Sequence, residues 1–336
     1  MKIASIGIVY NLKDKTRTDD LHEEYDEIET IEAIRDELES LGASVVLLEQ
    51  TIDLASELIR VKPDMVFNIA EGIGKTRSRE SQVPCLLESL GIPYTGSDPL
   101  SLGVTLDKYL TNTVLEKAGL PVPRAFTAAT NEDADIASKG PCREGSWIVK
   151  PRWEGSSKGI FDDSLSSSPD DLAKKAARLI KAYEQPVIIE EFLPGDEITA
   201  AVRGNSRPEV FGMMKISPKN KEGNFIYSIE QKRDWREKIV YEAEAAVPRN
   251  AAAKIREAAS GAFKALALRD IARIDFRVDR TGTPKIIDVN PLPGLSPAYS
   301  DLVIMCRLSG RSYSELIHSI LSNALGRYNA VIVKVS

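Results

Sequence analysis

Short apolar stretches alternate with segments of helical spacing along the first part of the chain. KIASIGIVY, ASVVLLE and DMVFNI have the apolar pattern of buried strands. Between the first two, Ile28, Ile31, Ile34 and Leu38 recur on one side of a predicted helix, and Gly42 would end it. Because strands and helices alternate, we expect a parallel sheet with helices on its faces in roughly the first hundred residues.

The pattern changes beyond that region. RAFTAAT and WIVK predict strands, and a helix is expected to follow with Ser168 as its N-cap and Pro169 in its first turn. VIIEEF, EITAAVRG, EVFGMMKI and the pair RIDFRV and KIIDVN, joined by the turn DRTG, predict a largely antiparallel region. We therefore expect an α/β protein that is α+β in parts, with units at 1–101, 102–186 and 187–336.

Length and composition fit this division. A chain of 336 residues exceeds the usual size of one hydrophobic core. A net charge of -6 argues against a nucleic-acid or anionic-membrane partner. Three scattered cysteines and two histidines indicate neither a disulfide framework nor a zinc site, and no apolar stretch has the length of a membrane span. A cytoplasmic protein that acts on small molecules is the expectation.

IVKPRWEGSSKGI places a lysine where a strand becomes a small, polar loop. Lys150 would end the strand, and residues 154–159 are too polar and flexible to pack in a core. Such junctions often hold phosphates, but the spacing matches neither of the two familiar glycine-rich phosphate signatures. A solvated hairpin with a stray lysine fits equally well, so the loop needs partners elsewhere in the chain.

The predicted hairpin near the C-terminus offers such partners. Arg273 and Asp275 share one strand face, and Asp288 and Asn290 share one face of the next strand. A register that brings Asp275 beside Asp288 and Asn290 would gather oxygen ligands of the kind that Mg²⁺ prefers. Solvent-facing residues of a half-exposed sheet would have the same alternation.

A third candidate site lies in VIIEEFLPGDEIT. Glu190 and Glu191 end an apolar strand, and Glu197 follows a Pro-Gly turn. Carboxylates so placed suit an adenine amino group and ribose hydroxyls. Exposed charges at a strand end would also have this pattern.

The order of these motifs resembles the ATP-grasp superfamily, specifically its D-alanine:D-alanine ligase-like branch. The resemblance rests on FNIAEG, LLESLGIPYTGSDPLSLGVTLDK, AGLPVP, IVKPRWEGSSKG, VIIEEFLPGDEIT and RIDF…IIDVNPLPGLSP, and it covers nearly the whole chain. Several motifs in the right order are more specific than any one of them. The resemblance implies three domains, with ATP held between two antiparallel-sheet domains.

The resemblance also implies roles for individual residues. Arg273, Lys232 and Ser156 would be catalytic, and Asp275, Asp288 and Asn290 would hold two Mg²⁺ ions, or Mn²⁺. The nucleotide would contact Lys108, Lys150, Glu154, Ser156, Ser157, Glu190, Glu191 and Glu197. The substrates would contact Glu23, Glu71, Arg233, Gly294 and Ser300.

The departures from the family pattern fall on the substrate side. Glu71 stands where the family has histidine, and Arg233 stands where it has tyrosine after the loop lysine. SPAYSD is one residue longer than expected, which leaves Tyr299 as a rival to Ser300 for the substrate carboxylate. Glu23 is placed only by counting back from Gly42. The two amino acids joined are therefore expected not to be two D-alanines.

The expected activity is that of an ATP-dependent carboxylate–amine ligase that joins small amino-acid-like substrates through an acyl phosphate. One rival is a genuine D-alanine:D-alanine ligase with divergent substrate contacts. Another is an ATP-binding regulatory module without catalysis, although such a module would not need both Arg273 and a full set of metal ligands. Family members are often dimers, so a homodimer is a further expectation.

Overall fold

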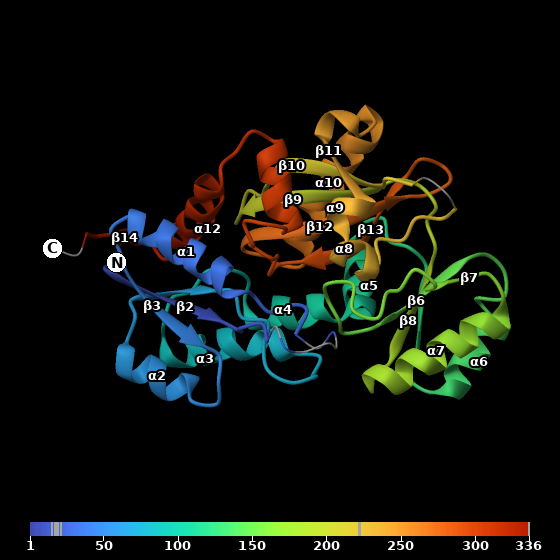
Figure 1. Cartoon of the computed structure of the whole chain (residues 1–336), viewed down its shortest axis with the longest axis horizontal. Helices are drawn as coiled ribbons and strands as arrows, with labels where there is room; N and C mark the ends of the chain where they lie inside the picture. Colours follow the sequence, from blue (N-terminus) through green and yellow to red (C-terminus); the bar gives the residue numbers. More distant parts are fainter. Residues whose placement is uncertain (15, 17–19, 21, 221–222, 335–336) are drawn as a thin grey trace.

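The structure is a computed structural model that describes residues 1–14, 16, 20, 22–220 and 223–334. A parallel sheet lies near the two termini, and two antiparallel sheets lie beyond it (Figure 1). The two antiparallel sheets come from consecutive parts of the chain, coloured green and yellow to red. This arrangement is the mixed α/β architecture that the sequence predicts.

The parallel sheet has the strand order β3-β2-β4. Strands β2 and β4 are buried almost throughout, which explains their nearly continuous apolar sequences, whereas β3 at the edge of the sheet is mostly half-buried. The C-terminal end of the chain returns to this region, since β14 pairs in parallel with β1 and helix α12 packs against α1. The elements here are β1 (Lys2–Ile3), β2 (Ser5–Tyr10), α1 (Ile28–Ser40), β3 (Ser44–Glu49), α2 (Leu54–Val61), β4 (Met65–Asn68), the 3₁₀ turn η1 (Arg79–Ser81), α3 (Gln82–Leu90) and α4 (Pro99–Leu106).

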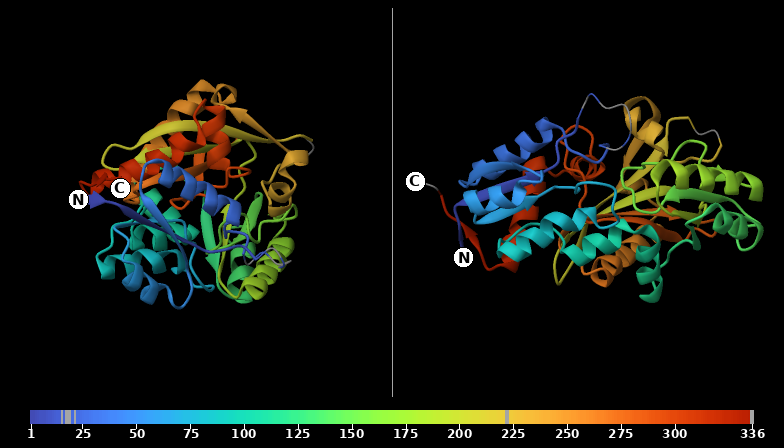
Figure 2. Two further views of the ribbon diagram at one scale, coloured as in Figure 1. Left: turned by 60° about the vertical axis from the view of Figure 1, so that its left-hand side comes forward. Right: turned by 90° about the horizontal axis from the view of Figure 1, so that it is seen from below.

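The next sheet is antiparallel, with the order β5-β8-β6-β7. Helices α6 and α7 lie together on one side of it (Figure 2). Ser168 accepts a hydrogen bond from the backbone N–H of Asp171 and Pro169 opens α7, which confirms the predicted helix start. The elements are α5 (Lys108–Lys117), β5 (Ala125–Ala128), α6 (Asn131–Lys139), β6 (Trp147–Pro151), β7 (Leu165–Ser166), α7 (Pro169–Tyr183) and β8 (Val187–Glu191).

The second antiparallel sheet has the order β11-β10-β9-β12-β13. One of its faces packs against α10, and the other packs against α11 and α12. The elements are β9 (Glu197–Gly204), β10 (Glu209–Pro218), α8 (Ile229–Arg233), α9 (Trp235–Lys238), β11 (Ile239–Ala243), the 3₁₀ turn η2 (Glu244–Ala246), α10 (Arg249–Ala265), β12 (Asp270–Val278), β13 (Pro284–Asn290), α11 (Asp301–Leu308), α12 (Tyr313–Arg327) and β14 (Val331–Ile332).

The boundaries of these sheets differ in two places from the expected units. Strand β8 begins at Val187 but pairs with β5 and β6, so the change from one antiparallel sheet to the next falls after Glu191. The final helix and strand pack on the N-terminal region rather than only on their own unit. Periodicity did not predict α4, α6 or α11.

Within the described residues, no helix combines the length and the apolar character needed to cross a membrane.

Candidate active site

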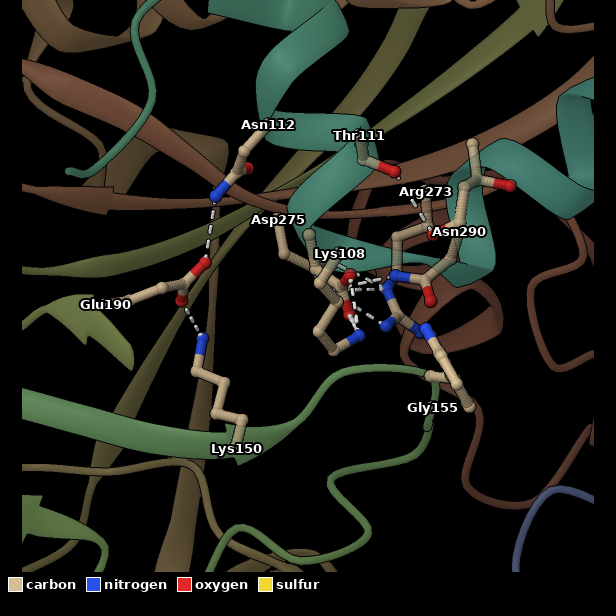
Figure 3. Close-up of polar contacts among 12 residues, drawn as sticks. Lys108, Thr111, Asn112, Lys150, Gly155, Glu190, Arg273, Asp275 and Asn290 are labelled. Atoms are coloured by element: carbon tan, nitrogen blue, oxygen red, sulfur yellow. Dashed lines mark hydrogen bonds and ion pairs between the residues drawn. The ribbon is translucent and has the colours of Figure 1, made fainter. Parts of the chain in front are cut away.

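The hairpin of β12 and β13 gathers the predicted oxygen ligands. Asp275 pairs with Asp288 across the hairpin and Arg273 pairs with Asn290. The side chains of Arg273, Asp275 and Asn290 lie together (Figure 3). Arg273 Nη2 is 2.9 Å from Asp275 Oδ2, and Asn290 Nδ2 donates to the same oxygen at 3.2 Å. Thr199 of β9 donates its hydroxyl to Asp275 Oδ1 at 2.6 Å. Asp275 is therefore held rigidly by three neighbours.

Two lysines from the preceding sheet region line the same cavity as Asp275 and Asp288. Lys108 begins α5, and its Nζ lies 3.0 Å from Asp288 Oδ1. Lys150 of β6 pairs with Glu190 of the adjacent β8, and Asn112 of α5 donates to the other oxygen of Glu190 at 3.0 Å (Figure 3). Both lysines are buried. Lys108 thus meets an acid from the final third of the chain, whereas Lys150 pairs with an acid of its own sheet.

The loop after Lys150 has the conformation of a tight polar nest. Ser156 and Ser157 both have left-handed backbone angles, with φ of 48° and 58°. Such angles are costly for residues other than glycine and are found mainly where surrounding contacts or function require them. A Cβ atom on Gly155 would lie 2.5 Å from Glu24 Oε1, so only glycine fits there. The loop lies between Lys150 and the N-terminal region.

Glu24 holds this loop, although no pattern in the sequence marks it. Its Oε1 accepts from the Gly155 N–H at 2.6 Å, and its Oε2 lies 2.9 Å from Arg79 and 2.8 Å from Lys158. Glu154 also pairs with Arg79, at 3.3 Å, and with Lys158. Burial alone would raise the pKa of Glu24, but the charges of Arg79 and Lys158 outweigh it and lower this pKa to about 2. We call Glu24, Arg79, Glu154 and Lys158 the loop clamp.

The three glutamates of VIIEEFLPGDEIT line one cavity but differ in their partners. Glu190 pairs with Lys150, whereas Glu191 lies 3.3 Å from Arg124 and 3.6 Å from Lys285. Glu197 lies 3.5 Å from Arg277, and burial raises its pKa. Arg277 stacks over the Phe192 ring at 4.9 Å. This central cavity is also lined by Lys108, Lys150, Ser156, Ser157, Lys232, Arg273, Asp275 and Asp288.

The donor set at the hairpin fits Mg²⁺. Asp275 and Asp288 have carboxylate oxygens, and the Asn290 side-chain N–H donates a hydrogen bond to Asp275, which leaves the Asn290 amide oxygen available to a cation. Among the described residues, no three His, Cys, Asp or Glu side chains are grouped closely enough to hold a metal ion by themselves. Such a site would need oxygens from water and phosphate as well, which is the usual arrangement for Mg²⁺.

Lys232 and Arg233 lie on α8, beside the hairpin. Lys232 is held over the Tyr227 ring at 4.9 Å, and burial lowers its pKa. It lines the central cavity together with Arg273. Arg233 points to a different partner, since its Nη2 lies 3.2 Å from Glu23 Oε2. This pair is partly exposed.

Two further cavities adjoin the central one and hold the remaining predicted residues. The Ser300 cavity, of about 330 Å³, is lined by Glu23, Arg233, Gly294, Tyr299 and Ser300 among others. Ser300 Oγ accepts from the Ser296 N–H at 2.8 Å, and a Cβ atom on Gly294 would lie 2.9 Å from this Oγ. Both Tyr299 and Ser300 line the cavity, so either could meet a substrate carboxylate.

The Glu80 cavity is lined by Glu71 and by two glutamates that the sequence did not single out. Glu24 and Glu80 line it together with Glu71, facing the turn that follows β13. Burial raises the pKa of Glu71 well above its ordinary value, and the charges of Glu80 and Glu24 add to this effect. The same cavity is lined by Lys108, Lys232, Arg273, Asn290 and Gly294.

Comparison with known proteins agrees with this arrangement. Residues 114–322 match the family model described as D-ala D-ala ligase C-terminus. The chain is 33% identical over 307 residues to the uncharacterized protein y4sG of Sinorhizobium fredii, covering 87% of this chain and 86% of that one. It is 30% identical over 298 residues to a D-alanine–D-alanine ligase of Moorella thermoacetica, covering 87% and 92%.

Solved structures agree on the fold. The D-alanine–D-alanine ligase of Bacillus anthracis complexed with ATP superposes with a TM-score of 0.73 at 22% identity, covering 97% of this chain and 98% of that one. The VanG D-Ala:D-Ser ligase of Enterococcus faecalis gives a TM-score of 0.70 at 19% identity, covering 96% and 99%.

The chain therefore belongs to the D-alanine–D-alanine ligase C-terminal family of ATP-grasp enzymes, as the motifs suggested. Its relatives include both ligases and a protein without an assigned activity.

Proposed function

We propose that this protein is an ATP-dependent carboxylate–amine ligase that joins two small amino-acid-like molecules and releases ADP and phosphate. The observation that carries the proposal is that Lys108, Lys150, Asp275 and Asp288 line one central cavity, with Asn290 hydrogen-bonded to Asp275 beside it. Nucleotide binding alone would not require Arg273 and Lys232 in the same cavity.

The chemistry requires these groups because a carboxylate is a poor acyl donor. Transfer of the ATP γ-phosphoryl group to it creates an acyl phosphate with a good leaving group. Charge on the transferred group must be neutralised and the reactants must be held in line. Lys108 and Lys150 would hold the phosphates, and Ser156 and Ser157 would cover them with backbone and hydroxyl donors. Asp275, Asp288 and Asn290 would hold Mg²⁺, which supplies further neutralisation when bound.

An amine would then attack the acyl phosphate through a tetrahedral intermediate. Arg273 is fixed by two hydrogen bonds to Asp275, so its guanidinium is preorganised to stabilise the developing oxyanion. Lys232 on α8 would lie against the same reacting groups, and the loop at 154–159 would exclude water that otherwise hydrolyses the acyl phosphate. Glu190, Glu191 and Glu197 would contact adenine and ribose.

The substrates would occupy the Ser300 cavity and the Glu80 cavity. Glu23, Arg233, Gly294 and Ser300 line the first, and Glu71 lines the second. Glu71 makes one wall of this cavity acidic. The family pattern for joining two D-alanines has histidine at the same position. Homodimer formation stays a prediction.

The proposal is tested by phosphate release and amide formation across a panel of acids and amines with ATP and Mg²⁺. We expect turnover with an acid–amine pair other than D-alanine alone. If D-alanine alone suffices, the protein is a D-alanine–D-alanine ligase, as the names of several relatives would suggest. If the protein binds ATP with Mg²⁺ but no acceptor is ever phosphorylated, a regulatory ATP-binding module is the better account.

A further inference from the structure

Glu80 is a buried carboxylate that the proposed mechanism does not use. It lies in the 3₁₀ turn η1, directly before α3, and is only 8% exposed. It lines the Glu80 cavity with Glu71, across from the turn that follows β13. Glu71 follows β4, and its backbone N–H is fixed by a 2.8 Å hydrogen bond to the Asn11 side chain. Both glutamates therefore belong to the N-terminal wall of the site.

The other carboxylates of this cavity already have cations beside them. In the loop clamp, Glu24 and Glu154 share Arg79 and Lys158, so two negative charges meet two positive ones. Asp288 meets Lys108 at 3.0 Å. By contrast, within the described part of the chain the carboxylates of Glu71 and Glu80 make no hydrogen bond or ion pair. Burying a carboxylate without a partner is costly, and proteins normally avoid it.

The pKa values of Glu71 and Glu80 show that neither carboxylate is compensated by a nearby positive charge. Burial raises the pKa of Glu80 to about 8 and raises that of Glu71 well above its ordinary value. Glu24 and Asp288 act on Glu80 in the same direction, whereas Arg79 and Lys108 oppose them without cancelling the effect. A bound cation would replace a proton here and lower the cost of both charges.

The shape of the cluster favours an organic cation over a metal ion. Among the described residues, Glu24, Glu71 and Glu80 are not grouped closely enough to ligate a metal. The cavity has a volume of about 80 Å³, which suits the end of an aminoalkyl chain. An ammonium group has three donors, so it can address two separated carboxylates at once.

We propose that Glu71 and Glu80 receive a cationic group of a substrate, so that one of the two joined molecules is a basic amino acid or a diamine. A zwitterion such as alanine adds no net charge to the cavity and would leave both carboxylates uncompensated. A substrate with an additional ammonium group would compensate one of them and donate to both. This inference rests on the proposed function, because it assigns a substrate class to the same site.

The test compares molecules that differ only in the ammonium group. Lysine is set against norleucine, in both stereochemical forms, as the acid, and 1,5-diaminopentane is set against pentylamine as the amine. Each is supplied with ATP, Mg²⁺ and alanine of either form as the second substrate. We expect the charged member of at least one pair to have the higher kcat/KM, by about 10- to 100-fold, as a charge-assisted hydrogen bond would give.

The variants Glu80→Gln and Glu71→Gln test whether the preference for the charged substrate arises in the Glu80 cavity. We expect each to bring the charged-to-neutral ratio of kcat/KM close to one, whereas Glu257→Gln, on the exposed side of α10, should leave the ratio unchanged. Binding gives a second readout, since lysine or 1,5-diaminopentane should raise the Tm of the wild-type protein with a non-hydrolysable ATP analogue more than the neutral partner does. This difference should vanish in Glu80→Gln.

Two results would overturn the inference and leave the proposed function standing. One is amide formation in which the neutral member of each pair is used as well as the charged one. The other is a charged-to-neutral ratio that survives both substitutions. If no pair is joined, the proposed function loses support, and the Tm comparison still decides whether Glu71 and Glu80 bind an ammonium group.

Discussion

The proposed nucleotide side and the proposed substrate side of this site differ in how their charged side chains are paired. Around the hairpin, Arg273 meets Asp275 and Lys108 meets Asp288, so each cation has an acid beside it. On the N-terminal wall, Glu71 and Glu80 face a cavity with no such partner among the described residues. The paired region carries the family motifs, and the unpaired region carries the departures from them.

The loop clamp lies between the two sides and shows why the difference matters. Its four charged side chains are each less than one-tenth exposed, and they tie the loop at 154–159 to the N-terminal region. Because the clamp is balanced within itself, it stabilises the loop without needing a ligand. Glu71 and Glu80 have no such internal balance, so we expect a ligand to supply it.

Arg79→Met should have the largest effect on stability. The substitution leaves Glu24 and Glu154 buried with only Lys158 between them, so we expect a loss of about 3–5 kcal/mol in the free energy of unfolding. Chemical denaturation measures it. Arg178→Met, which breaks an exposed pair with Asp163, is the matched control and should cost far less. Similar losses in the two variants would mean that the clamp is not a buried network.

Arg273→Met should have the largest effect on catalysis. A positioned cation that stabilises an oxyanion typically contributes about 10²- to 10³-fold to kcat, so we expect a loss of that size. Affinity for ATP, measured by calorimetry, should change only a few-fold because Lys108 and Lys150 remain. The exposed Arg280→Met serves as the control. A large loss of ATP affinity with kcat preserved would place Arg273 in nucleotide binding instead.

Glu80→Gln should alter how stability depends on pH. In the folded protein the pKa of Glu80 is raised from 4.5 to about 8, so between these values the folded state holds more protons than the unfolded state. The contribution of Glu80 to the stability of the wild type is therefore fully present below pH 4.5 and is lost as the pH rises toward 8. Glu80→Gln has no carboxyl group to ionise. Its free energy of unfolding should therefore exceed that of the wild type by on the order of 1–3 kcal/mol at pH 8.

Thermal unfolding at pH 5 and pH 8 measures this change, with Glu257→Gln as a control that should show no pH-dependent difference. A constant gap between Glu80→Gln and the wild type at the two pH values would show that the Glu80 charge is already compensated. The contrast between paired charges around the hairpin and unpaired carboxylates at Glu71 and Glu80 would then be wrong.

The smallest effect is expected at Glu23 and Arg233. Their side chains are 20% and 46% exposed, so solvent screens the attraction. A double-mutant cycle with Glu23→Gln and Arg233→Gln should give a coupling energy below about 1 kcal/mol that declines with added salt. A coupling as strong as that within the loop clamp would contradict this expectation and extend the paired region into the Ser300 cavity.

The sequence predicted the strands that carry the chemistry better than it predicted their surroundings. Alternation in RIDFRV and KIIDVN was enough to expect Asp275 beside Asp288, and the structure has this register despite a bulge after Asp275. The sequence analysis singled out Glu23, whereas its neighbour Glu24 contacts the loop at 154–159. Residues on an irregular segment have no period, so adjacent glutamates there cannot be told apart from the sequence.

The contacts of Arg79 and Lys158 with Glu24 could not be predicted for a related reason. Their partner Glu24 is 55 and 134 positions away along the chain, and no local pattern marks contacts of that range. Glu80 resembled any charged residue in a polar loop until the fold buried it. Lys158 had one signal available, since it follows Glu154 at a spacing of four residues.

By itself, the sequence determined the alternation of elements, the hairpin that pairs two aspartates and the family to which the motifs belong, because each depends on local spacing. Only the tertiary structure decided which charges are balanced. Charge compensation in a buried site depends on distances between segments remote in sequence and on exclusion of water, and neither is written in the order of residues.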